Sequence, residues 1–244
     1  MDYMKREPER RARLSPWVRS VIALALNYHH PEDVKPDSIR TGRVARYAYG
    51  ADYHKVIEKK LKRLSSFVRE AGGEGTEARG YVDTGPVLER AFAQKAGLGF
   101  VGKNTNLITR GYGSWVFLAC LLTNLELEED AAHTGSCGSC RLCLDACPTG
   151  ALLGGNVLDA TKCISYWTIE AKEQAPAPLK ERFGDWAFGC DICQEVCPYN
   201  FRAKTTREPD LYPLKKAGTW IDLDGVRVEP GSPLKRSKHL KTVL

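Results

Sequence analysis

The chain has 244 residues, which is long enough to bury a hydrophobic core without disulfide bonds. Hydrophobic residues make up 43% and charged residues 27%, which excludes a disordered, collagen-like or coiled-coil protein. The formal net charge is +6, and residues 201–244 hold ten basic and five acidic residues. This basic end either contacts a polyanion such as nucleic acid or is an ordinary surface imbalance.

The sequence contains no apolar run of about 18 residues that would predict a membrane span. No apolar segment of a secretory signal follows the charged N-terminus. We therefore expect a cytoplasmic protein without a membrane partner.

Residues 1–130 predict a mixed core of strands and helices. Residues 18–27 form a candidate buried strand. Residues 53–72 carry apolar side chains at helical spacing, with Asp52 as a candidate N-cap and Gly72 as a candidate stop.

Further elements are expected downstream in the same segment. Residues 78–83 predict a short strand, and a helix opens at Pro86 and ends at Gly97. Strands are expected over 100–109 and 114–123, around a glycine turn. Because strands and helices alternate without a regular βαβ repeat, we predict an α+β fold.

The rest of the chain divides by composition. Residues 131–200 are rich in Cys, Gly and Pro and predict a second unit. Residues 201–244 predict a basic extension that either wraps over the core or leads to a further segment. The sequence therefore predicts three segments, 1–130, 131–200 and 201–244.

Cysteine spacing is the strongest signal in the sequence. Eight of the nine cysteines fall between Cys137 and Cys197, and without an export signal clustered cysteines favour metal ligation over disulfides. The first run is Cys137-x2-Cys140-x2-Cys143-x3-Cys147-Pro148, which is the bacterial ferredoxin pattern. The second run is Cys190-x2-Cys193-x3-Cys197-Pro198, and Cys163 lies between the runs.

Two cubane clusters need eight thiolates, and these cysteines supply that number. In the ferredoxin pattern the last cysteine of each run binds the other cluster. The first predicted ligand set is therefore Cys137, Cys140, Cys143 and Cys197, and the second is Cys147, Cys163, Cys190 and Cys193. Zinc binding by the Cys-x2-Cys pairs is the alternative. The ninth cysteine, Cys120, lies in an apolar strand and is expected to be a core residue.

Two other patterns are weaker. No GxGxxG is present, so a Rossmann nicotinamide site is not expected. The Asp52-Tyr53-His54 segment resembles the DxHxxG motif in which histidine binds the cobalt of cobalamin, but Ile57 occupies the glycine position. We therefore expect His54 to be an ordinary helix or surface residue.

Several polar residues in the first segment are candidates for ligand contact. Arg46 lies among aromatic residues, and guanidinium groups suit anionic or carboxamide partners. Asp83 ends a strand before a Gly-Pro break, where it either projects into a cleft or caps a turn. Small residues surround Lys103, Asn104 and Asn106, so this segment is either close to a large ligand or a glycine-rich turn.

These motifs together resemble one enzyme family. The segments GRVARYAYGADYH, YVDTGPVLERAFAQKAGLGFVGKN, SCGSCRLCLDACPTGAL and FGCDICQEVCPYN are similar, in collinear order, to tRNA epoxyqueuosine reductase. Members of that family carry a further N-terminal stretch and C-terminal helical repeats, which we expect this sequence to lack.

The resemblance implies a nitroreductase-like cobalamin-binding domain followed by a ferredoxin-like domain with two 4Fe–4S clusters. It implies an oxidoreductase that converts epoxyqueuosine in the tRNA anticodon to queuosine, with cob(I)alamin supplied with electrons by the clusters. It also implies a tRNA partner, an external one-electron donor and a monomer. Asp83 matches the family's acid, and burial beside the corrin is expected to raise its pKa. The cofactor contacts that the resemblance implies are Arg6, Arg46, Asp83, Lys103, Asn104, Asn106, Ser165 and Asp191.

Two alternatives come from other classes. A cobalamin-dependent reductive dehalogenase also pairs cobalamin with two cubanes, but such proteins usually carry a twin-arginine signal and a tyrosine proton donor. A ferredoxin-type electron carrier would leave residues 1–130 unexplained.

Overall fold

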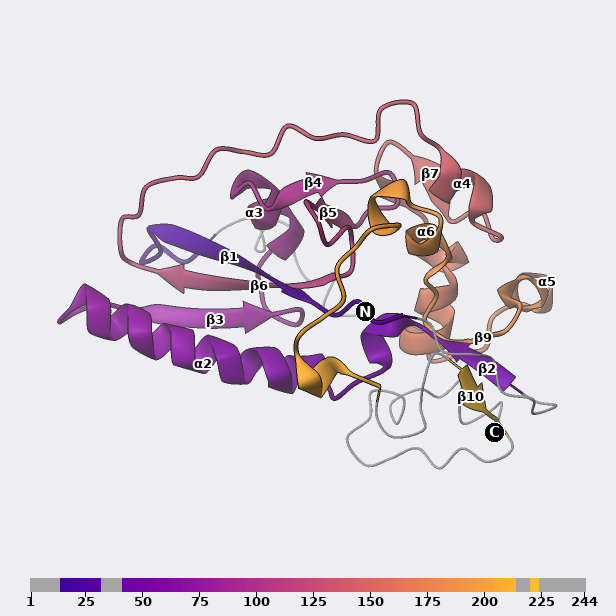
Figure 1. The fold of residues 1–244 in the computed structure, drawn as a ribbon, viewed down its shortest axis with the longest axis horizontal. Helices are drawn as coiled ribbons and strands as arrows, with labels where there is room; N and C mark the ends of the chain where they lie inside the picture. Colours follow the sequence, from indigo (N-terminus) through magenta and orange to yellow (C-terminus); the bar gives the residue numbers. More distant parts are fainter. Residues whose placement is uncertain (1–13, 32–40, 214–219, 224–244) are drawn as a thin grey trace.

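A computed structural model describes residues 14–31, 41–213 and 220–223 of the chain. Its helices and strands are mixed along the chain, and this confirms the α+β class (Figure 1). No helix among these residues has the length and apolar character needed to cross a membrane.

The main sheet has three antiparallel strands in the order β1-β6-β3, with β1 at Ser20–Asn27, β6 at Val116–Thr123 and β3 at Ala78–Val82. Because side chains alternate along a strand, β6 contributes to two cores. Ala119 and Leu121 pack with the side chains of α2, whereas Cys120 and Leu122 pack near α3 on the other face. Cys120 is 0% exposed, which confirms its place in the core.

Helix α2 (Tyr53–Gly72) lies along the sheet beside β3 (Figure 1). Its first turn is capped by Asp52, whose carboxylate accepts the backbone N–H of His54 at 3.1 Å. The helix ends at Gly72, and Gly73 follows with φ of 79°, a left-handed conformation that glycine tolerates. The predicted helix is confirmed at both ends.

Two predictions in the next stretch were wrong in detail. Helix α3 spans only Glu89–Lys95 and begins three residues after Pro86, because residues 83–87 form an irregular bend. The strand expected over 100–109 is a hairpin of β4 (Gly99–Val101) and β5 (Leu107–Thr109). A turn separates its strands, with Gly102 N–H donating to the Asn106 carbonyl at 2.9 Å.

A second sheet connects the three predicted segments. Its order is β10-β2-β9, with β2 at Thr41–Val44, β9 at Trp186–Phe188 and β10 at Trp220–Asp222. Strands β2 and β9 are parallel, and β10 is antiparallel to β2. The cysteine-rich segment is therefore attached to the N-terminal segment through backbone hydrogen bonds.

The cysteine-rich segment consists of short elements joined by turns. They are α4 (Leu142–Ala146), β7 (Leu152–Gly154), β8 (Val157–Leu158), α5 (Ala177–Lys180) and α6 (Ile192–Glu195). A π-helical turn spans Tyr166–Glu170, and 3-10 turns span Arg46–Ala48, Ala160–Lys162, Glu181–Phe183, Pro198–Asn200 and Pro209–Leu211. Because these elements are short, most of the cysteines lie in or next to turns.

The described part of the C-terminal segment packs back against the core. Thr206 N–H donates to the His29 carbonyl at 2.7 Å, and its hydroxyl donates to the Asn27 carbonyl at 2.6 Å. Ala51 N–H donates to the Asp210 carbonyl at 2.8 Å. Up to residue 213, the described part of this segment therefore packs on the core.

Candidate active site and cluster-binding region

The four thiols of the first predicted set lie near enough to interact electrostatically, although no group of three or more Cys, His, Asp or Glu side chains in the described part of the chain is arranged to hold a metal ion. Burial raises the pKa of the Cys197 thiol, and the neighbouring Cys137, Cys143 and Cys140 thiolates raise it further. Cys137 also packs against the small core that Cys197 forms with Phe100 and Ile108. The last cysteine of the second run therefore lies with the first run, as crossed ligation requires.

The second predicted set gathers in the same way. Burial raises the pKa of the Cys190 thiol, with further contributions from Cys163 and Cys147. The pKa of Cys193 is also raised, by burial first and then by the charge of Cys190. Cys163, which lies outside both compact motifs, thus belongs with these thiols.

The chemistry of these donors fits metal clusters. All nine cysteines are free of disulfides. Buried thiols with like-charged neighbours do not ionise by themselves, whereas a coordinating metal deprotonates a thiol outright. Two groups of four thiols are the ligand sets that two 4Fe–4S clusters need.

Lys103 anchors the loop of the first cysteine run. Its ammonium donates to the carbonyls of Gly138 and Cys140, both at 2.8 Å, and its backbone N–H points at the Cys137 sulfur at 3.4 Å. The side chain predicted to contact a cofactor thus holds the backbone beside the first thiol set.

A cavity of about 530 Å³ lies between the sheet and the cysteine-rich segment. Cys147, Cys163, Cys190 and Cys193 all line it. Five predicted site residues line it as well: Asp83, Asn104, Asn106, Ser165 and Asp191. A second cavity of about 710 Å³ adjoins it and shares Tyr53, Asp83, Arg90, Thr105, Val116 and Phe117. The second thiol set and the candidate acid therefore face one space.

Asp83 occupies a tight turn directly after β3. The Thr84 N–H donates to the Val82 carbonyl at 2.6 Å across Asp83, whose φ is 52°. This left-handed conformation is uncommon outside glycine, and Asp tolerates it better than most residues. The turn places a carboxylate that is 52% exposed at the mouth of both cavities.

The Asp83 carboxylate accepts two side-chain hydrogen bonds. The Tyr53 hydroxyl donates to Oδ2 at 2.8 Å, and His54 Nε2 lies 3.1 Å from the same oxygen. The hydrogen bond from His54 lowers the pKa of Asp83, and the partial burial of the carboxyl opposes this shift. Two donors therefore stabilise the ionised carboxyl and lower the pKa of Asp83 in this structure, and the rise expected from burial beside the corrin stays a prediction.

Arg46 contacts Asp191, a residue that lines the cavity. Asp191 is 1% exposed and accepts the Arg46 backbone N–H at 2.7 Å, while the Arg46 guanidinium lies 3.3 Å from Asp191 and 2.8 Å from Glu195. Burial raises the pKa of Asp191 to about 6, and the interactions with Arg46 oppose that shift. Asp191 reaches the cavity wall, whereas Arg46 pairs with it from outside the lining.

Asn104 joins the two parts of the molecule at this wall. Its amide donates to the Cys193 carbonyl at 3.3 Å, and its side-chain oxygen accepts the Asn106 N–H at 3.3 Å. Of the predicted site residues, Arg6 lies outside the described residues.

Sequence reasoning missed Tyr53 and His54. His54 was expected to be an ordinary residue, but the start of α2 places both side chains against Asp83. The signal was the carboxylate at Asp52, which caps the helix and also lies 2.8 Å from His54 Nδ1. A histidine between two carboxylates is an unusual arrangement for a surface residue.

Comparison with protein families assigns both halves of the chain. Residues 9–84 match the family described as epoxyqueuosine reductase QueG, DUF1730. Residues 136–200 match the 4Fe–4S double cluster binding domain, which supports iron–sulfur clusters over zinc. The second match covers all eight clustered cysteines.

Curated relatives carry the same name. The epoxyqueuosine reductase of Cellulophaga algicola is 46% identical over 230 residues, which are 91% of this chain and 74% of the relative. The epoxyqueuosine reductase of Synechocystis is 48% identical over 204 residues, which are 83% of this chain and 70% of the relative.

Solved structures show the same fold. An epoxyqueuosine reductase crystallised with an epoxyqueuosine-modified tRNA-Tyr stem loop has a TM-score of 0.74 at 36% identity, over 83% of this chain and 54% of that one. An epoxyqueuosine reductase structure from Bacillus subtilis has a TM-score of 0.72 at 36% identity, over 81% of this chain and 53% of that one. In that structure the catalytic aspartate loop is swung out of the active site. This chain thus spans about half the length of these solved chains. The two curated relatives are 46–48% identical to this chain, and the match covers 70–74% of their length; the chain therefore belongs to the epoxyqueuosine reductase family.

Proposed function

We propose that this chain reduces epoxyqueuosine in tRNA to queuosine, with cobalamin in the 530 Å³ cavity and electrons supplied by two 4Fe–4S clusters. One observation carries the proposal: the four thiols of the second set and the Asp83 carboxylate line the same cavity. An electron donor and a candidate proton donor thus face one reaction space, which a reductive loss of oxygen requires.

The cavity has the character of a cofactor site. Its volume lies within the range of about 300–1,000 Å³ that is typical of ligand pockets. Its lining combines apolar side chains, such as Val116, Phe117 and Leu152, with the amides of Asn104 and Asn106. The adjoining 710 Å³ cavity leaves room beside Asp83 for the modified base. We assign Asp83, Asn104, Asn106, Ser165 and Asp191 to cofactor contact, and Lys103 and Arg46 to supporting its surroundings.

Bound cobalamin would supply, as cob(I)alamin, the two electrons for opening and deoxygenating the epoxide. The protein must then protonate the departing oxygen, because an alkoxide is a poor leaving group. Asp83 is the acid in this proposal, and the catalytic aspartate loop of the Bacillus subtilis relative supports that assignment. Tyr53 would orient the Asp83 carboxyl through its 2.8 Å hydrogen bond.

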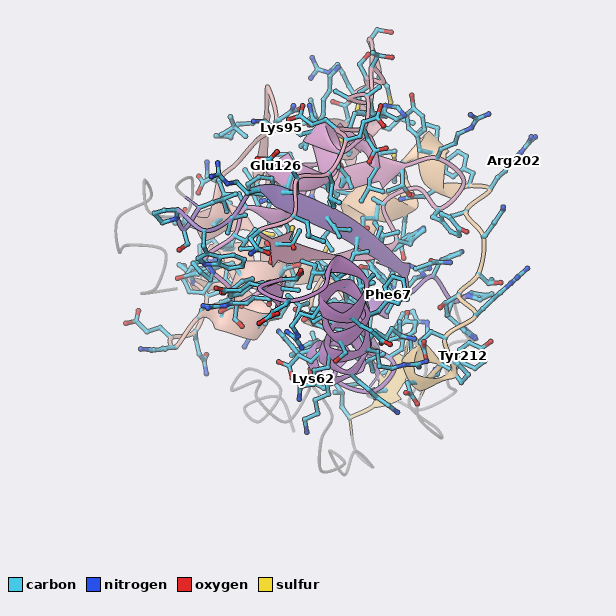
Figure 2. All side chains as sticks on the ribbon, turned by 90° about the vertical axis from the view of Figure 1, so that its left-hand side faces the viewer. Lys62, Phe67, Lys95, Glu126, Arg202 and Tyr212 are labelled. Carbon is cyan, nitrogen blue, oxygen red and sulfur yellow. The ribbon has the colours of Figure 1, made fainter. Side chains whose placement is uncertain are left out.

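The tRNA would bind where basic side chains project from the C-terminal segment. Arg202 points away from the ribbon (Figure 2). Lys204 Nζ lies 5.6 Å from the ring centroid of Tyr112. The solved relative with a bound tRNA stem loop supports a tRNA substrate. Three basic residues of the same segment, Lys235, Arg236 and Lys238, lie outside the described residues.

We keep the division into a cobalamin-binding segment (1–130), a cluster-binding segment (131–200) and a basic extension (201–244) as part of this proposal. An external one-electron donor, a monomeric state and a cytoplasmic location stay predictions.

The test is anaerobic turnover of tRNA that contains epoxyqueuosine, with nucleoside mass spectrometry to detect queuosine. We expect product only when cobalamin and a reductant are both present. An absorption spectrum after anaerobic reconstitution separates the ferredoxin alternative, since a plain carrier would show iron–sulfur absorbance and no corrin uptake. Corrin uptake without queuosine formation would refute the assigned substrate.

A further inference from the structure

Three side chains contact one another in a row where the start of α2 meets the end of β3. Asp52 Oδ1 lies 2.8 Å from His54 Nδ1, and His54 Nε2 lies 3.1 Å from Asp83 Oδ2. Both ring nitrogens of His54 therefore face carboxylates. An ionised carboxylate only accepts hydrogen bonds, and both imidazole nitrogens are donors only when the ring is protonated. The geometry thus favours an imidazolium between two carboxylates.

The proposed reaction needs more protons than one carboxyl group holds. Converting an epoxide to an alkene and water breaks two C–O bonds and consumes two electrons and two protons, both of which end on the same oxygen. A single Asp83 carboxyl can deliver one proton before it must be protonated again. Asp83 must therefore be protonated again within each turnover, and a neighbouring proton donor can supply that proton.

We propose that His54 passes protons from solvent to Asp83, once for each of the two proton transfers that turn the epoxide oxygen into water. This inference rests on the proposed reductase function. In each transfer, His54 Nε2 first gives its proton to Asp83 Oδ2, and the Asp83 carboxyl then gives a proton to the oxygen. His54, whose side chain is 22% exposed, then takes a proton from water. His54 acts through Asp83 and is therefore a positioning and proton-supplying residue.

The pKa shifts of the neighbouring groups favour His54 as the proton source. The hydrogen bond to Asp83 raises the pKa of His54, with Asp52 contributing in the same direction. Tyr53 is a poorer acid, because burial and the nearby Asp83 charge raise the pKa of its hydroxyl. Tyr47 behaves likewise, with its pKa raised by burial. Arg90, the cation that lines both cavities with Asp83, makes its described hydrogen bond to the Thr105 carbonyl.

The first test needs no activity. NMR titration of the His54 ring, in protein with oxidised clusters and no cobalamin, is expected to give a pKa above the ordinary value of about 6.5. Asp83→Asn and Asp52→Asn should each lower that pKa, and Asn at position 52 still caps the helix. Tyr53→Phe is the matched control, since it removes a hydrogen bond to Asp83 and keeps both contacts of His54. A His54 pKa that is ordinary and insensitive to Asp83→Asn would overturn the proposal.

The second test is the pH profile of single-turnover rates with pre-reduced holoenzyme. The wild-type rate should fall as pH rises through the raised His54 pKa, because the proton-supplying form is the imidazolium. His54→Gln keeps a hydrogen-bond donor near Asp83 but cannot supply a proton. We expect a loss of roughly 10²–10⁴ in rate near neutral pH. The variant's rate should recover toward acidic pH, where the Asp83 carboxyl itself holds a proton.

His30→Gln is the control for this profile, since His30 contacts Tyr212 and lies outside the relay. Asp52→Asn provides a second variant, with His54 intact and the falling limb of the profile moved to lower pH. Wild-type protein that makes no queuosine would refute the proposed function itself. Active wild type, together with a His54→Gln variant of unchanged rate and pH profile, would refute only the relay.

Discussion

Cys163 gives the most direct test of how the clusters are held. It follows the 3-10 turn Ala160–Lys162 and lies 16 residues after the first cysteine run and 27 before the second. Its thiol nevertheless lines the cavity with Cys147, Cys190 and Cys193. Cys163→Ala would remove one of four ligands from this set and leave the other set of four intact.

The expected magnitude follows from that grouping. Two cubanes hold about eight iron atoms per chain, so loss of one cluster should leave about four. The backbone around Cys163 should persist, because its N–H donates to the Ala160 carbonyl at 3.1 Å and its carbonyl accepts from Trp167 N–H at 3.3 Å. The defect should therefore be confined to the cluster that faces the cavity.

The assay is iron and sulfide analysis of anaerobically purified protein, with EPR of the dithionite-reduced sample. Cys120→Ala is the matched control. It removes a thiol that is 0% exposed in the sheet core, so it should cost roughly 1 kcal/mol in stability and no iron. A Cys163→Ala protein with about eight iron atoms and unchanged EPR signals would refute the assignment. Iron loss in Cys120→Ala would make Cys120 the candidate ligand instead.

Four further outcomes are expected. Wild-type protein should contain about eight iron and eight sulfide per chain, and a maximum near four or stoichiometric zinc would contradict two clusters. Asp83→Asn should lower the single-turnover rate by roughly 10²–10⁴ with cobalamin loading intact, and loss of cobalamin would instead assign Asp83 a binding role. Neutralising Lys235, Arg236 and Lys238 together should lower tRNA affinity and flatten the slope of log K against log salt by about 2 units, whereas an unchanged slope would leave them as surface charge. Leu121→Ala, at a side chain that is 0% exposed, should lower the free energy of unfolding by about 2–5 kcal/mol in denaturant titrations. Phe67→Ala, at a 64% exposed position on α2, should cost under about 0.5 kcal/mol and serves as its control (Figure 2).

Local patterns predicted the regular elements well. Helix α2 begins after Asp52 and ends at Gly72 as expected, because its cap and its apolar spacing are both local. Strand β1 begins two residues after its predicted start, because its apolar run is also a local pattern. The hairpin of β4 and β5 was missed, because the turn at Gly102 depends on a backbone hydrogen bond to Asn106 that apolar alternation does not report.

The double-cluster domain was predictable from the sequence, because the cysteine spacing within each run reflects the shape of a cubane, and the individual ligands stay predictions. The place of Cys163 was inferred only by counting, and the structure brings its thiol to Cys190 and Cys193. Contacts of this kind join segments that are far apart in the chain, so no local pattern specifies them.

The sequence by itself therefore determined the cysteine spacing, the main helix and the place of Asp83 at the end of a strand, since each depends on residues close together in the chain. Only the tertiary structure decided the surroundings of that acid. His54 lies 29 residues before Asp83 and contacts it because the start of α2 meets the end of β3. That contact lowers the pKa of Asp83, because hydrogen bonds to a carboxylate favour its ionised form and outweigh partial burial.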